Sequence, residues 1–318
     1  MEPRDKIRVG VVGVGHLGRH HARILSELEG CFLYGIVDID PQRREEIAAE
    51  YQTRALSDYR ELIGHVDAAC IVVPTVLHHQ IAGDLLQQGI DVLVEKPMTS
   101  TLDQARELID LAHSGGALLQ VGHLERFNGA VLALEQYIRD PRFIESYRIA
   151  PFINRGLDVD VVLDLMIHDI DIILSIVKSG IKRVDAVGVP VISPKIDIAN
   201  ARLEFDNGCL ANVTASRVSL KKERKMRIFQ EGSYFSLDYA DSLLYSCTLS
   251  QDTSDGSPYP WHVVRTDIPV PDVEPLRAEL EAFINSCSTR KRPLVAGEEG
   301  YDALAVAFMV LDRISSLP

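Results

Sequence analysis

The first third of the chain alternates short, β-branched apolar runs with longer segments of helical apolar spacing. An apolar run bounded by Gly, Pro or an acidic residue is typical of a buried strand, and the helical spacing is typical of an amphipathic helix. The pattern predicts strands over residues 7–12, 30–37, 67–73, 91–95 and 117–122, and helices over 17–28, 78–88 and 102–114. Such β-α-β repetition predicts a parallel, doubly wound sheet with ligands at the carboxyl ends of its strands.

From residue 124 onwards the pattern changes to strands that follow one another directly. We expect strands at 143–153, 184–191, 199–205, 209–216, 226–230, 234–238 and 243–249, a long helix over 159–177, and helices over 279–287 and 300–315. Consecutive strands with short turns such as 206–208 indicate a largely antiparallel sheet. The sequence therefore predicts two domains, an α/β domain over 1–123 and an α+β domain over 124–318, with residues 252–259 as the least ordered loop.

Composition narrows the class of protein. A net charge of −13 and a pI near 5.2 disfavour a general nucleic-acid or anionic-membrane binder. No apolar run is long enough to span a bilayer, and the charged N-terminus lacks the apolar block of a signal peptide. The five cysteines are scattered and odd in number, so we expect reduced, structural thiols in a cytoplasmic protein.

A glycine-rich loop directly follows the first strand. It reads Gly13-Val14-Gly15-His16-Leu17-Gly18, and the second strand ends at Asp38, twenty residues after Gly18. Strand, loop, helix, strand and acid together are the context of a Rossmann dinucleotide site. The bland alternative is a glycine turn in some other α/β protein.

Asp38 bears on the choice of cofactor. Its carboxylate would accept hydrogen bonds from the adenosine ribose and repel a 2′-phosphate, which favours NAD over NADP. Arg43 and Arg44 follow soon after and are able to accommodate a 2′-phosphate, so they weaken that preference.

Further candidate residues fall at the carboxyl ends of the predicted strands. They are Pro74, Thr75, Glu95, Lys96 and His123. The adjacent His78 and His79 invite a metal interpretation, but neighbouring residues of a helix point about 100° apart. We therefore expect one histidine to face the cofactor and the other to face solvent, with no metal.

The predicted helix over 159–177 carries four ionisable residues, Asp160, Asp164, His168 and Asp171. Asp164 and His168 stand at i and i+4, hence on one face of an α-helix. Desolvating such groups is costly without partners, which makes the stripe a candidate site. Solvent exposure and a shared metal ion are the alternatives; an acid/base pair for oxidation of a hydroxyl fits best beside a dinucleotide.

Together these residues resemble the glucose–fructose oxidoreductase/inositol dehydrogenase/MocA (Gfo/Idh/MocA) family. The motifs that carry the resemblance are Gly13-x-Gly15-x-x-Gly18, Pro74-Thr75 with His78, Glu95-Lys96-Pro97, and Asp164-x-x-x-His168-Asp169. The resemblance implies NAD(P) binding by the first domain and an open sheet in the second that serves substrate and subunit contacts. It implies that Lys96 hydrogen-bonds the reacting hydroxyl, that His168 takes its proton and that Asp164 orients His168. It also makes a cis Lys96–Pro97 bond plausible.

One segment departs from the family pattern. Where family members often carry a glycine-rich triplet before the catalytic helix, this chain has Asp158-Val159-Asp160. Substrate contacts there should differ from those of free-sugar enzymes.

A narrower resemblance joins residues 122–128 and 159–171 to the UDP-N-acetylglucosamine 3-dehydrogenases. It implies oxidation at C3 of UDP-N-acetylglucosamine for the 3-amino sugar of lipid A, with an aminotransferase consuming the ketone. Substrate-binding candidates are Lys96, His123, Arg126, Arg155, Asp164 and His168. Cations for the diphosphate could come from Arg126, Arg155, Arg217 or the run 221–225, and that run could equally be a solvated connection.

Two other functions compete with this one. The first is a dehydrogenase of a free sugar or polyol such as inositol, and the second is a non-catalytic NAD(P)-binding sensor.

An exposed sheet face usually has to be covered, so we expect a homodimer or homotetramer.

Overall fold

The computed structural model of the chain describes residues 6–152, 159–251 and 261–316. The chain forms two compact units: Met1–Leu124 with Glu274–Asp302, and Glu125–Val273 with Ala303–Pro318. The sequence pattern suggested a single boundary after residue 123. The units differ from that division because residues 274–302 return to the first unit.

The first unit is built on six parallel strands in the order β3-β2-β1-β4-β5-β6. The strands are β1 (Ile7–Val12), β2 (Cys31–Val37), β3 (Arg54–Leu56), β4 (Ala68–Ile71), β5 (Asp91–Glu95) and β6 (Leu119–Gly122). The helices are α1 (His16–Glu27), α2 (Pro41–Glu50), α3 (His78–Leu86), α4 (Leu102–Gly115) and α7 (Pro275–Thr289), with short turns η1 (Tyr59–Leu62) and η2 (Thr75–Leu77). This order confirms the predicted Rossmann sheet and places its ligand crevice where the strand order reverses, between β1 and β4.

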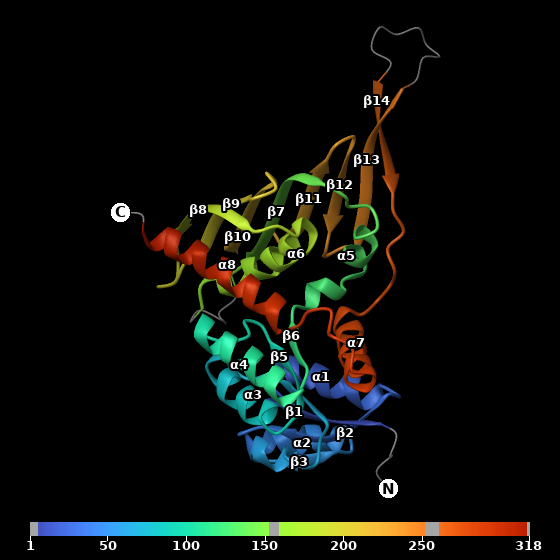
Figure 1. Ribbon diagram of the computed structural model, residues 1–318, viewed down its shortest axis with the longest axis vertical. Coiled ribbons are helices and arrows are strands. Elements are labelled where there is room, and N and C mark those ends of the chain that lie inside the picture. Colours follow the sequence, from blue (N-terminus) through green and yellow to red (C-terminus); the bar gives the residue numbers. More distant parts are fainter. Residues whose placement is uncertain (1–5, 153–158, 252–260, 317–318) are drawn as a thin grey trace. The chain divides into compact units, whose positions relative to one another are not determined.

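Helix α7 explains why residues 274–302 belong to the first unit. Its buried Leu280, Phe283 and Ile284 join the same apolar core as Val9 of β1 and Leu33 of β2. In Figure 1 this helix lies beside α1. The apolar face of α7 was visible in the sequence, but which sheet it covers depends on contacts between residues more than 200 positions apart.

The second unit is built on eight strands in the order β14-β13-β12-β11-β7-β10-β9-β8. They are β7 (Pro141–Pro151), β8 (Ile181–Val189), β9 (Ile198–Phe205), β10 (Leu210–Ser219), β11 (Glu223–Gln230), β12 (Ser233–Asp238), β13 (Leu243–Gln251) and β14 (Trp261–Asp267). The remaining elements are η3 (Leu124–Phe127), α5 (Gly129–Leu134), η4 (Val162–Met166), α6 (Ile167–Val177) and α8 (Gly297–Ser315). The mostly antiparallel sheet was predicted; its central pair β7 and β10 is parallel, and β14 was not expected.

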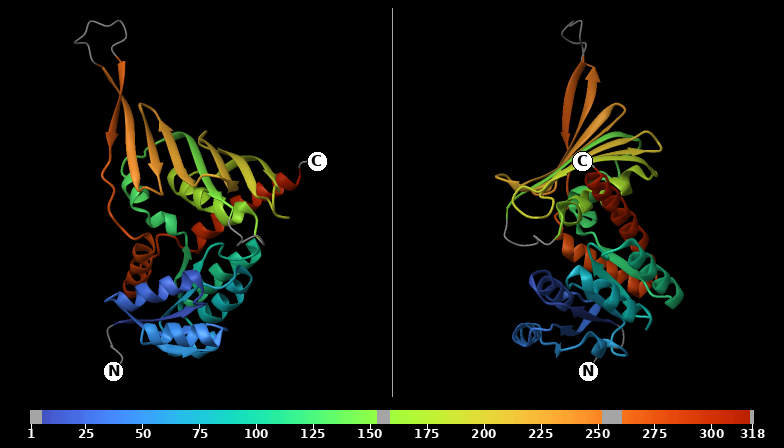
Figure 2. Two further views of the ribbon diagram at one scale, coloured as in Figure 1. Left: turned by 180° about the vertical axis from the view of Figure 1, so that it is seen from behind. Right: turned by 90° about the vertical axis from the view of Figure 1, so that its left-hand side faces the viewer.

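One face of this sheet carries helices, as Figure 2 shows for α5 and α6. The end of α8 also packs there, since Arg313 donates to the carbonyl oxygen of Val184. The opposite face carries the partly exposed Phe143 and Tyr147 and the exposed Arg227. The strands thus alternate buried and open positions, as expected for a sheet covered on one side.

The predicted long helix over 159–177 is two elements. Residues Val162–Met166 form a π-helical turn, and the α-helix begins only at Ile167. A π turn is closed by i→i+5 hydrogen bonds. A step of four residues therefore covers less than one full turn there. The α-helical geometry assumed for Asp164 and His168 is therefore wrong for the segment that carries Asp164.

Two expectations from composition can be compared with the structure. All five cysteines are buried and free. Within the described residues, every helix is too short or too polar to cross a lipid bilayer.

Candidate functional site

The loop between β1 and α1 has the shape that a dinucleotide phosphate site requires. Gly13 has φ +87°, and a Cβ added to it would lie 2.5 Å from the carbonyl oxygen of Val72, so a side chain would be both strained and obstructed. A Cβ on Gly18 would lie 1.8 Å from the carbonyl oxygen of Gly13. Nothing lies within 4 Å of the Cβ position of Gly15, so a pyrophosphate has room to approach the start of α1 there. His16 and Leu17 are exposed on the first turn of that helix.

Asp38, at the end of β2, is tied directly to this loop. Its carboxylate accepts hydrogen bonds of 2.9 Å from the backbone N–H groups of Val14 and Asp40. Arg43 places a guanidinium nitrogen 3.4 Å from both carboxylate oxygens, and Arg44 donates to the Asp38 carbonyl oxygen. The acid is therefore fixed in place beside the loop, with one arginine already neutralising part of its charge.

A cleft of about 450 Å³ opens beside the loop and Asp38. Its lining includes Gly13, Gly15, Asp38, Ile39, Arg43 and Pro74. The side chain of Ile39 is almost fully exposed, which offers an apolar surface to a flat ring. The residues present thus fit a nicotinamide dinucleotide, with the adenosine end at Asp38 and the pyrophosphate at Gly15.

The Glu95-Lys96-Pro97 turn at the end of β5 is held by a histidine that the sequence analysis missed. His21 of α1 is fully buried, and its Nε2 lies 3.1 Å from Oε1 of Glu95. Burial alone would raise the pKa of Glu95, but His21 and the neighbouring Lys96 hold that pKa below its ordinary value. The Lys96 backbone N–H donates to the other Glu95 oxygen at 3.3 Å, and the Lys96–Pro97 bond is cis.

His78 takes a different place from the one expected. It is 1% exposed, with Nδ1 3.1 Å from the Pro97 carbonyl oxygen and Nε2 2.8 Å from the Val73 carbonyl oxygen. Burial lowers the pKa of His78. It links the Pro97 turn to the chain after β4 instead of presenting its ring to a ligand. His79 pairs with Glu107 on the solvent side, and the described residues contain no cluster of three metal-ligating side chains.

In the second unit, the predicted polar stripe is divided. Asp164 lies in the π turn and His168 in the first turn of α6, and both are partly exposed. Asp160 accepts a hydrogen bond from the Ile196 backbone N–H at 2.9 Å. Asp171 is buried and pairs with Arg126 at 3.5 Å. Asp171 is therefore enclosed, whereas Asp164 and His168 are partly exposed, as is Asp160, which has one oxygen engaged by Ile196.

Two of the predicted diphosphate-binding arginines are buried. Arg126 is 6% exposed and faces Asp171, and Arg217, also 6% exposed, donates to Asp197, Ser193 and the Val159 carbonyl oxygen. Both guanidinium groups face partners inside the second unit. A sequence alone does not distinguish such a buried arginine from an exposed one. Arg155 and Asp158 lie outside the described residues. His123, 1% exposed, is likewise enclosed in the first unit.

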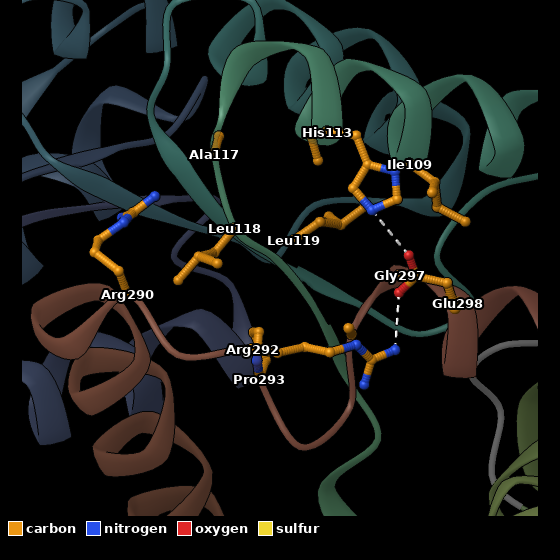
Figure 3. A pocket seen from close by; sticks show the side chains of 12 residues that line it. Ile109, His113, Ala117, Leu118, Leu119, Arg290, Arg292, Pro293, Gly297 and Glu298 are labelled. Atoms are coloured by element: carbon orange, nitrogen blue, oxygen red, sulfur yellow. Dashed lines mark hydrogen bonds and ion pairs between the residues drawn. The ribbon is translucent and has the colours of Figure 1, made fainter.

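Another hollow in the first unit lies away from the glycine loop. It has a volume of about 240 Å³ and lies between α4, the start of β6 and residues 290–298 (Figure 3). Its rim charges pair with one another, since Glu298 contacts His113 at 3.1 Å and Arg292 at 2.9 Å. Arg290 pairs with Asp91 at the amino end of β5. This position is opposite the strand ends that bind ligands in such sheets, so the hollow is not part of the site.

Two family models match the chain, one in the Rossmann part and one in the part that follows it. A family model of the Gfo/Idh/MocA oxidoreductases with an NAD-binding Rossmann fold matches residues 7–123, and a Gfo/Idh/MocA C-terminal domain model matches residues 127–236. The chain is 37% identical over 312 residues to a UDP-N-acetylglucosamine 3-dehydrogenase of Acidithiobacillus ferrooxidans, covering 96% of each.

Two further comparisons bear on fold and substrate. A solved structure of UDP-N-acetylglucosamine 3-dehydrogenase from the same organism matches with a TM-score of 0.91 and 36% identity, covering 98% of each chain. A scyllo-inositol 2-dehydrogenase (NAD(+)) of Bacillus subtilis is 28% identical over 239 residues, covering 67% of this chain and 68% of the relative. The inositol enzyme is thus the more distant relative by both identity and coverage.

Proposed function

Since this chain belongs to the Gfo/Idh/MocA family of oxidoreductases, we propose that it oxidises the C3 hydroxyl of UDP-N-acetylglucosamine with NAD⁺, giving the 3-keto sugar nucleotide. The near full-length similarity to a UDP-N-acetylglucosamine 3-dehydrogenase supports this proposal most strongly. The runner-up, oxidation of a free polyol such as inositol, is supported only by the more distant relatives.

Three side chains carry the proposed chemistry. When bound, the dinucleotide supplies the acceptor for the hydride that leaves C3. The hydroxyl proton goes to His168, because histidine ordinarily titrates near neutral pH and can accept a proton there. Lys96 donates a hydrogen bond to the hydroxyl oxygen, and Asp164 orients and charge-balances His168.

For the cofactor, we propose NAD over NADP on the strength of Asp38. A bound adenosine ribose would meet a carboxylate that two backbone N–H groups already hold in place. The same carboxylate would repel a 2′-phosphate, and Arg43 is partly neutralised by its contact with Asp38. Selectivity therefore rests on a fixed negative charge.

We expect the Asp38→Asn variant to lose this selectivity. The amide keeps an oxygen that can accept from Val14 but removes the charge. Losing a charge-assisted hydrogen bond to the ribose should raise the KM for NAD⁺ by about 10- to 100-fold, while the KM for NADP⁺ falls. Steady-state kinetics with both cofactors measure the ratio. Asp110→Asn, on the exposed face of α4, is the control; an unchanged NAD⁺/NADP⁺ ratio in Asp38→Asn would refute the assignment.

The cations for the substrate diphosphate need a new assignment. With Arg126 and Arg217 enclosed, the exposed candidates among the described residues are Lys221 and Lys222, between β10 and β11. Lys225 instead contacts Glu223 and Asp238. We propose Lys221 and Lys222, with Arg155, as the groups that meet the diphosphate.

We also propose a homodimer or homotetramer that buries the open face of the eight-stranded sheet. Aromatic and aliphatic side chains on that face, such as Phe143, Phe229 and Tyr234, pack against one another across the strands, and exposed apolar patches usually mark interfaces. Light scattering at micromolar concentration should give two or four times 35.3 kDa. A monomeric mass would exclude this assembly.

The chemistry of the product indicates which kind of enzyme would act next. A cytoplasmic enzyme of this kind would hand its 3-keto sugar to an aminotransferase, which would install the 3-amino group found in some lipid A. The ketone is reactive, and oxidation of the C3 alcohol to it by NAD⁺ is unfavourable. Net conversion therefore needs a following reaction that consumes the ketone.

The test of the function is NADH formation by the purified protein with UDP-N-acetylglucosamine, other sugar nucleotides, glucose and inositol. A carbonyl trap should be present so that product does not limit the signal. Signal with UDP-N-acetylglucosamine alone supports the proposal. Signal only with a polyol supports the runner-up, and NAD⁺ binding without turnover on any compound supports a sensor.

A further inference from the structure

The π turn Val162–Met166 lies within the stretch of ionisable residues at 160–171. It carries Asp164, and it lies between Asp160 and His168. π turns are rare and are retained mostly at functional sites, so other contacts must hold this one in place. The structure shows such contacts at both of its ends.

Arg217 of β10 secures the residues before the turn. Its guanidinium donates to the Val159 carbonyl oxygen at 2.7 Å, to Asp197 at 2.8 Å and to the Ser193 hydroxyl at 3.0 Å. Asp197 in turn accepts hydrogen bonds from three consecutive backbone N–H groups, those of residues 191–193. The backbone of Ile196 completes the attachment, because it donates to Asp160 and accepts from the Val161 N–H, each at 2.9 Å.

Arg148 of β7 secures the residues after the turn. It binds Asp169 with two parallel hydrogen bonds, Nε to Oδ2 at 2.8 Å and Nη2 to Oδ1 at 3.1 Å, and it donates to Glu125 at 2.8 Å. Arg148 is 2% and Asp169 1% exposed. Asp169 follows His168 directly in the chain, so this fork fixes the backbone next to His168.

The two arginines come from neighbouring strands. Arg148 lies opposite Ala215 in the parallel β7–β10 pair, and Arg217 follows two residues later on the same face. This is the helix-covered face, since Arg148, Ala215 and Arg217 are all buried. Two paired strands, β7 and β10, therefore hold both ends of the π turn, and Arg217 lies where the register of this pair shifts, between Ser216 and Ser219.

Stability alone is a poor explanation for this arrangement. The cost of desolvating a buried ion pair nearly cancels its Coulomb attraction, and apolar replacements of such pairs are often neutral. A bidentate arginine–carboxylate pair instead fixes orientation, because its planar fork matches both oxygens at once. What the Arg148–Asp169 pair supplies is a defined rotation and height of the first turn of α6.

We infer that Arg148 and Arg217 are positioning residues that hold the π turn and α6 so that Asp164 and His168 present one fixed geometry to the substrate. The inference rests on the proposed function for the roles of Asp164 and His168. Asp169 and Asp197 in turn hold the two arginines in place. Asp169 accepts hydrogen bonds from Arg148 through both carboxylate oxygens, and Asp197 accepts one from Arg217.

The variant Arg148→Lys tests this inference, because lysine keeps the charge and loses the fork. We expect kcat to fall on the order of 10²-fold, with the KM values for UDP-N-acetylglucosamine and NAD⁺ changed by less than about threefold. Amide hydrogen exchange in the full-length protein should accelerate within residues 161–171 and stay at wild-type rates elsewhere. Arg142→Lys, on the same strand but exposed and paired with Asp140, should match the wild type in both measurements.

A second variant guards against misfolding. The triple substitution Arg148→Met, Asp169→Leu and Glu125→Gln removes the three buried charges of this network together, so it should fold and should still show the lowered kcat. Wild-type kcat in Arg148→Lys, or faster exchange spread over the whole second unit, would overturn the inference. If the wild-type protein itself does not oxidise UDP-N-acetylglucosamine, the proposed function fails separately, and unchanged exchange over residues 161–171 in Arg148→Lys would still refute the positioning role.

Discussion

Replacing His168 by asparagine should lower kcat for UDP-N-acetylglucosamine oxidation by about 10²- to 10⁴-fold. Asparagine is close to histidine in size and can hydrogen-bond the hydroxyl, but it cannot take the proton. Because His168 belongs to the second unit and the glycine loop to the first, the affinity for NAD⁺ should stay near the wild-type value. Stopped-flow or steady-state NADH formation, with NAD⁺ binding measured by calorimetry, gives both quantities.

The matched control is His79→Asn. His79 is a partly exposed histidine on α3 that pairs with Glu107, and its replacement should leave turnover unchanged. If His168→Asn kept more than about a tenth of wild-type kcat, His168 would not be the proton acceptor, and Lys96 would become the leading candidate for that role.

Replacing Lys96 by methionine should lower kcat/KM by about 10²- to 10³-fold, the typical effect of removing one hydrogen-bond donor at a reacting oxygen. Methionine has similar length and no charge, so the Glu95–Lys96–Pro97 turn should keep its shape: Glu95 remains hydrogen-bonded to His21 and to the backbone of residue 96. NADH formation over a range of substrate concentrations measures the loss.

Lys291→Met controls for the loss of a lysine in the same unit, since Lys291 is exposed and away from the glycine loop. The double variant Lys96→Met/His168→Asn adds a further check. If both side chains act on one hydroxyl, their effects should combine to less than the product of the single losses. Independent, fully multiplicative losses would argue that the two groups do not share one reacting centre.

The first unit could be predicted from the sequence because its signals are local. Five of its six strands are short, mostly apolar runs, whereas β3 (Arg54–Leu56) has no such run and the sequence pattern does not predict it. The glycines of the β1–α1 loop show the conformations that the motif requires, with Gly13 at φ +87°. The Glu95-Lys96-Pro97 turn was identified as a motif, but its support by His21 was not. His21 shares the buried face of α1 with Gly18, Ala22 and Leu25, so a histidine on an apolar stripe was the available signal.

The second unit was harder to predict because its site depends on pairs distant in sequence. The sequence points to Arg126 as a substrate ligand because a guanidinium suits bidentate phosphate contact and follows the strand end at His123, whereas Asp171, 45 positions later, faces it inside the fold. The Arg148–Asp169 pair escaped notice for the same reason. A π turn has no distinctive residue composition, so the sequence pattern predicts ordinary α-helix over residues 162–166, where the structure has the π turn.

The most direct test of the proposed function follows one atom. UDP-N-acetylglucosamine carrying deuterium on C3 is incubated with the wild-type protein, NAD⁺ and a carbonyl trap. The mass of the reduced cofactor is then measured by mass spectrometry. We predict reduced cofactor that carries one deuterium, because the hydride comes from C3. Reduced cofactor without deuterium would place the oxidation at another carbon, and no reduced cofactor, despite NAD⁺ binding, would contradict the proposed reaction itself.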